Sequence, residues 1–218
     1  MLRNPAIAFL ALCLLGCASS PREPAPNLTL LKWQCIQWHD SGAYDRAVAR
    51  AAIPARKALE HYLHGVTPQN FAVVFDIDET LLSNWPYLSA TQFAINPETF
   101  ATWAAREQGT ALAPLREIFA WAHAYQIPIF LISGRDESLR AATQKDLAEA
   151  GYWGWSGLFL KPSSYREASI IPFKSGVREM LTEKGYNLIL NVGDQDSDLA
   201  GGYARHHYKL PNPFYFIP

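Results

Sequence analysis

The chain has 218 residues, of which 49% are hydrophobic, and its 19 basic and 20 acidic residues give a formal net charge of -1. This balance provides no basic face for polymeric nucleic acid and no acidic tail. The sequence contains no internal repeat, and no apolar run of about 18 residues follows the N-terminal segment. The composition therefore favours a globular domain with a well-buried core.

Residues 1–16 have the pattern of a signal peptide. Arg3 precedes an apolar stretch from Ala6 to Leu15, which is too short to remain as a membrane span. The sequence Leu-Leu-Gly-Cys ending at Cys17 resembles a bacterial lipoprotein signal, which implies cleavage before Cys17 and lipidation of that cysteine. An ordinary secretory signal is the alternative. Ala18 is not acidic, which by the same resemblance implies an outer-membrane location in the bacterial cell envelope.

Residues 17–29 are expected to form a lipidated tether, because the three prolines between Ser19 and Asn27 favour extended backbone. Cleavage and lipidation account for the first two of the three cysteines. Cys35 alone then stays in the folded part, so no intramolecular disulfide is expected there. Residues 30–218 are enough for one α/β domain but too few for two comfortable ones.

Apolar periodicity predicts alternating helices and strands along this domain. A helical region is expected over about Leu31 to His64, and helical stretches lie between most of the strands that follow. Strands are expected near five positions, Phe71, Ile127, Leu158, Leu188 and His207. Such alternation predicts a parallel sheet with helices on both faces.

The most informative segment is the strand from Phe71 to Phe75, which is followed by Asp-Ile-Asp-Glu-Thr. Its β-branched and aromatic residues predict a buried strand. Asp76 and Asp78 then lie at its carboxyl end, where open α/β sheets bind ligands. Carboxylates after a strand also serve as turn formers or helix caps, so this motif alone leaves both interpretations open.

An insert of about residues 84–116 separates the first two predicted strands and is longer than a usual strand-to-helix connection. It is rich in aromatic residues and predicts a small helical cap over the site. Trp85 and Tyr87 follow Asp76 closely, which makes them candidates to line a leaving-group pocket and stack on an aromatic or nucleobase group. The alternative is that these aromatics only pack the cap against the core.

The second predicted strand ends in Ser133-Gly134-Arg135. A hydroxyl and backbone N–H groups at such a strand-to-helix turn suit an anion, although an ordinary turn explains the same residues. Asp136 is expected to cap a helical stretch from Glu137 to Ala150.

Two further segments carry candidate residues. Lys174 precedes an amphipathic stretch from about Gly176 to Lys184, and Lys161, after the third predicted strand, competes with it for the same role. The fourth predicted strand ends in Gly193 and is followed by three alternating acids, Asp194, Asp196 and Asp198. Mg²⁺ takes hard oxygen ligands of this kind, although acids here also form turns.

In this order the motifs Asp-x-Asp-x-Thr, Ser-Gly-Arg, Lys and Gly-Asp-x-x-x-Asp resemble those of the haloacid dehalogenase superfamily of phosphatases. The similarity is closest to the acid phosphatases that include plant vegetative storage proteins and bacterial class C outer-membrane lipoprotein acid phosphatases. It covers most of the chain after about Leu30. The resemblance implies the three-layer Rossmann-like fold of that superfamily, with a parallel sheet and a small helical cap.

The resemblance also implies catalytic roles. Asp76 becomes the nucleophile of an aspartyl-phosphate mechanism, and Asp78 becomes the general acid and base. Ser133 and Lys174 complete the phosphoryl cradle, with Lys174 favoured over Lys161 because it precedes the helix that leads into the fourth strand.

Metal and substrate contacts follow from the same resemblance. Mg²⁺ would be held by Asp76, by the backbone carbonyl of Asp78 and by Asp194, with Asp198 in support. Thr80 and Arg135 are further substrate-binding candidates. Asp196 departs from the plant relatives, which often carry a bulky residue there, and the extra carboxylate could alter metal affinity or pH optimum.

The implied function is Mg²⁺-dependent hydrolysis of small phosphomonoesters, either aryl phosphates or nucleoside monophosphates, the latter as a 5′-nucleotidase. None of the six histidines lies in an Arg-His-Gly setting, which argues against a histidine nucleophile, and the absence of a P-loop makes nucleotide a substrate rather than an energy source. The alternative is a non-catalytic lipoprotein of the same fold with a storage, binding or envelope role. Some plant relatives have lost the nucleophile, but Asp76 and the other motif positions are present here.

Overall fold

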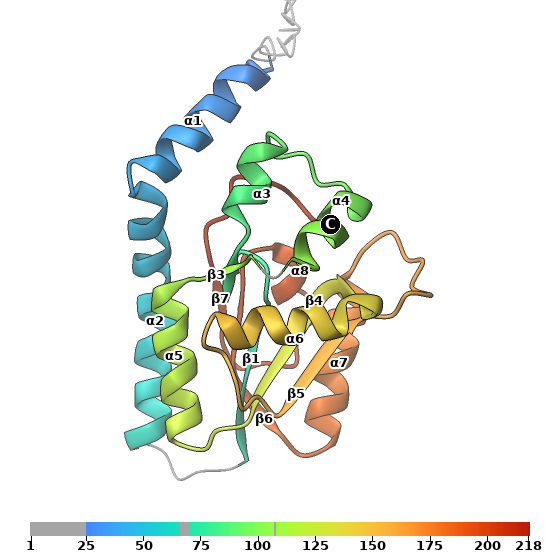
Figure 1. The fold of residues 1–218 in the computed structure, drawn as a ribbon. Helices are drawn as coiled ribbons and strands as arrows, with labels where there is room; N and C mark the ends of the chain where they lie inside the picture. Colours follow the sequence, from blue (N-terminus) through green and yellow to red (C-terminus); the bar gives the residue numbers. More distant parts are fainter. Residues whose placement is uncertain (1–24, 66–69, 107) are drawn as a thin grey trace, which may run out of the picture.

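The computed structural model describes residues 25–65, 70–106 and 108–218 (Figure 1). The predicted signal peptide, the lipidation site at Cys17 and the tether up to residue 24 lie outside these residues. Helix α1 begins at Leu28, so the last two residues predicted as tether belong to a helix instead. The reason is a local cap, because the side chain of Asn27 accepts a hydrogen bond from the backbone N–H of Leu30 at 3.2 Å.

The helices follow the predicted order. They are α1 (Leu28–Asp40), α2 (Ala43–Gly65), α3 (Trp85–Ala90), α4 (Pro97–Ala104), α5 (Ala113–Ala124), the 3₁₀ turn η1 (Glu137–Leu139), α6 (Arg140–Glu149), α7 (Ile171–Glu183) and α8 (Asp196–Leu199). The strands are β1 (Phe71–Phe75), β2 (Leu82–Ser83), β3 (Thr110–Ala111), β4 (Ile129–Asp136), β5 (Gly157–Lys161), β6 (Asn187–Gly193) and β7 (His207–Lys209).

Five strands form one parallel sheet in the order β5-β4-β1-β6-β7, which confirms the predicted sheet. Strand β1 lies at the centre, and all of its residues are buried. Phe75 at its end pairs with Leu131 of β4 on one side and with Val192 of β6 on the other. Because the strands are parallel, their carboxyl ends and the polar motifs after them meet at one edge.

Helices cover both faces of the sheet, so the predicted three-layer α/β architecture is confirmed (Figure 1). On one face, α2 and α5 contribute Leu59 and Leu115 to a cluster with Val73. On the other face, Leu181 of α7 packs in a cluster with Val74. The alternation of side chains along β1 therefore supplies both cores. In the described part of the chain, no helix combines the length and apolarity needed to cross a membrane.

The predicted insert forms a small cap made of α3, α4 and the two-stranded ribbon of β2 and β3 (Figure 1). It ends earlier than the expected residue 116, because α5 begins at Ala113 and packs against α2 in the core layer. The predicted cap of the next helical stretch is confirmed, since Oδ1 of Asp136 accepts a hydrogen bond from the Ser138 N–H at 3.0 Å. Helix α7 starts at Ile171 rather than near Gly176, with a proline in its first turn, where the missing N–H costs nothing.

Candidate active site

A cavity of about 390 Å³ lies at the carboxyl edge of the sheet. Its walls come from the strand ends, from the cap, from the segment between β5 and α7, and from the last residues of the chain. The polar residues predicted from the motifs that line it are Asp76, Asp78, Arg135, Lys174, Asp194 and Asp198. Residues far apart in the sequence therefore meet at one place.

Lys174 and two carboxylates form a buried ionic group in this cavity. The Lys174 ammonium donates a hydrogen bond to Oδ1 of Asp76 at 2.7 Å and another to Oδ1 of Asp198. The competing candidate, Lys161, lies elsewhere on the cavity wall, with Nζ 3.9 Å from a carboxylate oxygen of Asp136. The structure thus brings Lys174, and not Lys161, to the candidate nucleophile.

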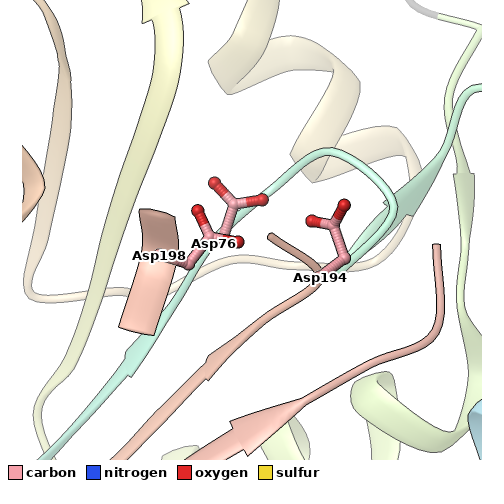
Figure 2. A group of neighbouring side chains, drawn as sticks. All are labelled: Asp76, Asp194 and Asp198. Carbon is pink, nitrogen blue, oxygen red and sulfur yellow. The ribbon is translucent and has the colours of Figure 1, made fainter. Parts of the chain in front are cut away.

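Asp194 completes a cluster of three buried acids with Asp76 and Asp198 (Figure 2). One carboxylate oxygen from each lies within 4.8 Å of the others. Both oxygens of Asp194 have donors, since Oδ1 accepts from the Thr80 hydroxyl at 3.1 Å and Oδ2 from the Asn212 amide at 2.7 Å. Its carboxylate is therefore held in a fixed orientation toward the cluster.

The charges of this cluster are not balanced by the protein. Burial, together with repulsion from Asp198, raises the pKa of Asp76 well above its ordinary value, although Lys174 opposes the shift. Burial and Asp198 likewise raise the pKa of Asp194 to about 7. Burial lowers the pKa of Lys174, but Asp198 and Asp76 outweigh that effect and raise it. One ammonium thus faces three carboxylates.

The donor set fits a divalent cation. Asp76, Asp194 and Asp198 offer the hard oxygen ligands that such ions take, and a double positive charge would offset the excess of carboxylates. The backbone carbonyl of Asp78, expected as a further ligand, stays a prediction, whereas the carboxylate of Asp78 has a partner of its own.

The Asp78 carboxylate is held by Arg135. The Nη2 atom of Arg135 lies 2.8 Å from Oδ1 of Asp78, and Nε lies 3.1 Å from both carboxylate oxygens. Arg135 also contacts Asp146 at 3.3 Å, and its side chain is fully buried. Arg135 was predicted to bind substrate, and although it lines the cavity, its guanidinium is bound by protein carboxylates. Its observed contacts orient Asp78.

The two predicted hydroxyl residues are both fully buried, and neither lines the cavity. The Ser133 hydroxyl accepts a hydrogen bond from the backbone N–H of Arg135 at 3.1 Å, near the carboxyl end of β4. Thr80 was predicted to bind substrate. In the structure its hydroxyl donates to Asp194, so its observed contact is with the acid cluster.

Trp85 and Tyr87 were predicted to line the leaving-group pocket, but neither is among the residues that line the cavity. Trp85 stacks on His39 of α1, with ring centroids 3.5 Å apart. The Tyr87 hydroxyl bonds with the Thr99 hydroxyl at 3.0 Å inside the cap. Trp85 and Tyr87 thus contact α1 and other residues of the cap, so these aromatics pack the cap, as the alternative interpretation held.

Other residues of the cavity wall were not singled out from the sequence. Phe100 of α4 lines the cavity, and its ring centroid lies 5.7 Å from the Arg135 guanidinium carbon. The C-terminal Ile217 and Pro218 form another part of the wall. Asp196 is exposed and pairs with Lys209 at 3.1 Å, so the extra carboxylate lies outside the acid cluster.

Glu79 is the least expected polar residue of the site. It is buried in the turn after β1, and burial and the neighbouring Asp78 raise its pKa to about 7. The Tyr215 hydroxyl donates to it at 2.7 Å and the Asn84 N–H at 2.6 Å. Its position between the motif residues Asp78 and Thr80 was the available sequence signal.

Residues 30–218 match the family described as HAD superfamily, subfamily IIIB (Acid phosphatase). The chain belongs to this family. It is 34% identical over 148 residues to Acid phosphatase 1 of Solanum lycopersicum, which covers 66% of this chain and 58% of the relative. It is 34% identical over 172 residues to Vegetative storage protein 1 of Arabidopsis thaliana, a match that covers 74% of this chain and 62% of the relative. The chain therefore spans less than two thirds of the length of these relatives.

A solved structure shares the fold of this acid phosphatase family member. The class C acid phosphatase from Bacillus anthracis superposes with a TM-score of 0.69 at 19% identity, over 87% of this chain and 85% of that chain. A structure of the class C acid phosphatase from the same organism with tungstate bound gives the same TM-score. Both the curated relatives and the fold agree with the resemblance drawn from the motifs.

The close approach of Gly193 to Asp198 gives a first prediction. A Cβ added to Gly193 would overlap the side chain of Asp198, whereas one added to Gly176 in α7 meets nothing within 4 Å. We expect Gly193→Ala to lower the free energy of unfolding by about 1–3 kcal/mol through overpacking. Gly176→Ala should instead raise it by about 0.5–1 kcal/mol, because alanine favours the helix. Urea unfolding measures both, and a neutral Gly193→Ala would contradict this packing.

The acid cluster predicts a metal effect that grows with pH. A carboxyl with a raised pKa keeps its proton in the folded state after the unfolded chain has lost it. For Asp194, stability therefore falls as the pH rises from about 4 to about 7. A divalent cation that binds the ionised cluster offsets this loss. We expect Mg²⁺ to raise the Tm more near about pH 8 than near about pH 5. Asp194→Asn should remove most of the rise, and a Tm indifferent to metal at both pH values would contradict the prediction.

Proposed function

We propose that this chain is a Mg²⁺-dependent phosphomonoester hydrolase that acts through an aspartyl-phosphate intermediate. The observation that carries the proposal is the arrangement of Asp76, which lines a cavity beside a buried ammonium and two further acids. A carboxylate can attack a phosphate dianion only where positive charge offsets the repulsion between them. Lys174 and a cation held by the acid cluster would supply that charge.

The proposed reaction has two steps. In the first, a carboxylate oxygen of Asp76 bonds to phosphorus while the bond to the leaving oxygen breaks, and Asp78 gives that oxygen a proton. In the second, Asp78 takes a proton from water, which attacks phosphorus and releases phosphate from Asp76. Lys174 stabilises the negative charge in both steps. Asp76, Asp194 and Asp198 would hold the metal ion, which would supply further positive charge to offset that of the phosphoryl group.

The cavity favours small substrates. Its volume of about 390 Å³ is in the range of small-molecule sites, and its walls include Phe100, Ile95 and Tyr165. A phosphate at the acid cluster with an aryl or nucleoside group against these apolar side chains would fill it. The tungstate bound to the Bacillus anthracis relative is also a tetrahedral oxyanion.

A second candidate function is a storage or binding role without turnover. The observation that favours it is the 34% identity to Vegetative storage protein 1. The presence of Asp76 together with Lys174 favours the enzyme, because a protein without turnover needs no buried nucleophile.

The deciding experiment is the release of p-nitrophenol from its phosphate by the chain without residues 1–18, across pH, with Mg²⁺ and then with EDTA. We expect turnover that requires metal and that falls by at least about 10³-fold in Asp76→Asn, because the amide is a poor nucleophile. Asp196→Asn is the matched control, since that acid is exposed and outside the cluster. A folded protein without turnover under any divalent metal would favour the storage or binding role.

We also propose that the protein is anchored to the bacterial cell envelope through a lipid on Cys17, with the outer membrane as its location. The apolar segment and the Leu-Leu-Gly-Cys sequence before the described domain support this proposal. We expect labelled palmitate to be incorporated into the wild type and into Cys13→Ser, and to be lost in Cys17→Ser. Label that survives in Cys17→Ser, or a wild type without label, would contradict the anchor.

A further inference from the structure

Asn84 occupies an unusual position next to the site. It is the N-cap residue of α3, and an asparagine there usually accepts a hydrogen bond from the first turn of the helix. Its side chain makes no such cap bond here. The amide Nδ2 instead donates to Oδ1 of Asp78 at 2.9 Å. Asn84 is only 1% exposed, so this amide is shielded from solvent. A role in helix capping therefore does not explain this side chain.

The orientation of the Asn84 amide is fixed by the cap. The indole Nε1 of Trp103 in α4 donates to the Asn84 amide oxygen at 3.1 Å. An indole N–H can only donate a hydrogen bond, so the atom that faces it must be the amide oxygen and not the amide nitrogen. The nitrogen must then face Asp78. If the amide turned over, its oxygen would lie against a carboxylate.

The backbone of Asn84 is held from the other side. Its N–H donates to Glu79 at 2.6 Å, and Glu79 also accepts from the Tyr215 hydroxyl. Asn84 is thus held by Trp103 of the cap through its side chain and by Glu79 of the turn after β1 through its backbone. Trp103 belongs to α4 of the cap, whereas Glu79 is buried in the turn after β1.

Asn84 also makes the two oxygens of Asp78 unequal. Oδ1 accepts from Nε and Nη2 of Arg135 and from Asn84, whereas Oδ2 accepts only from Nε of Arg135 within the described part of the chain. The oxygen with fewer donors has the free lone pair that a proton needs. The geometry assigns proton transfer to Oδ2.

We propose that Asn84 is a positioning residue for Asp78, and that Trp103 couples its amide to the cap. This inference rests on the proposed function, because it assumes that Asp78 transfers a proton. It makes the proton-transfer step sensitive to the position of α4. Phosphate binding at Lys174 does not pass through this hydrogen-bond chain.

The test uses Trp103→Phe, which keeps an aromatic side chain, smaller than the indole, and removes the N–H donor. We expect kcat to fall by about threefold to tenfold, the worth of one hydrogen bond, with KM within about twofold. The fall should be larger for phenyl phosphate than for p-nitrophenyl phosphate, because the more basic leaving group depends more on its acid. The control is Trp121→Phe, at a partly buried position of α5 outside the cavity, and it should leave kcat and KM unchanged.

A double-mutant cycle separates positioning from general damage. In an Asp78→Asn background, Trp103→Phe should lower kcat no further, because the group on which it acts is gone. Three results would overturn the role of Asn84 and Trp103. They are an equal fall in kcat from Trp103→Phe in both backgrounds, an equal fall in kcat for both substrates, and a change in KM without a change in kcat. An active wild type whose Trp103→Phe variant keeps its kcat would overturn this inference alone. A wild type that hydrolyses no phosphomonoester would overturn the proposed function as well.

Discussion

The uncompensated charge at the carboxyl end of β1 is the constraint on which the rest of the site depends. Asp76, Asp194 and Asp198 are buried together, and Lys174 is the one ammonium that contacts the group in the described structure. Buried carboxylates of this kind are costly unless they are paired or bind a cation. The surrounding fold is therefore arranged to hold like charges together, which no isolated turn or helix could do.

Each part of the fold contributes to that arrangement. The sheet brings Asp76 and Asp194 to one edge because β1 and β6 are neighbouring parallel strands. Helix α7 reaches the same edge through Lys174, and Gly193 leaves room for Asp198 to approach the chain. The C-terminal segment adds the Asn212 amide behind Asp194. The cluster is thus a product of long-range contacts, and these also close the cavity.

The sequence predicted the sheet and the position of the site better than the direction of individual side chains. Apolar runs bounded by polar motifs are strong indicators of buried strands, and parallel strands bring their ends together. The turn after β1 could not be predicted in the same way. Glu79 there has a left-handed backbone, with φ of 54°, and its partner Tyr215 lies 136 residues away in the sequence. That turn sends Thr80 behind Asp194 and directs α3 toward α1, which is why Thr80, Trp85 and Tyr87 do not contact the cavity.

The same charge arrangement sets the energetic cost of the candidate nucleophile. Loss of the nucleophile at the position of Asp76 removes one of three mutually repelling carboxylates and leaves Lys174 paired with Asp198. Functional sites often retain strain or repulsion that the fold alone would not select. A chain released from catalysis would therefore gain stability by losing the nucleophile, while its sheet, cap and cavity stay intact. Asp76 is present here although burial and the neighbouring acids raise its pKa, so the fold bears an energetic cost at this position.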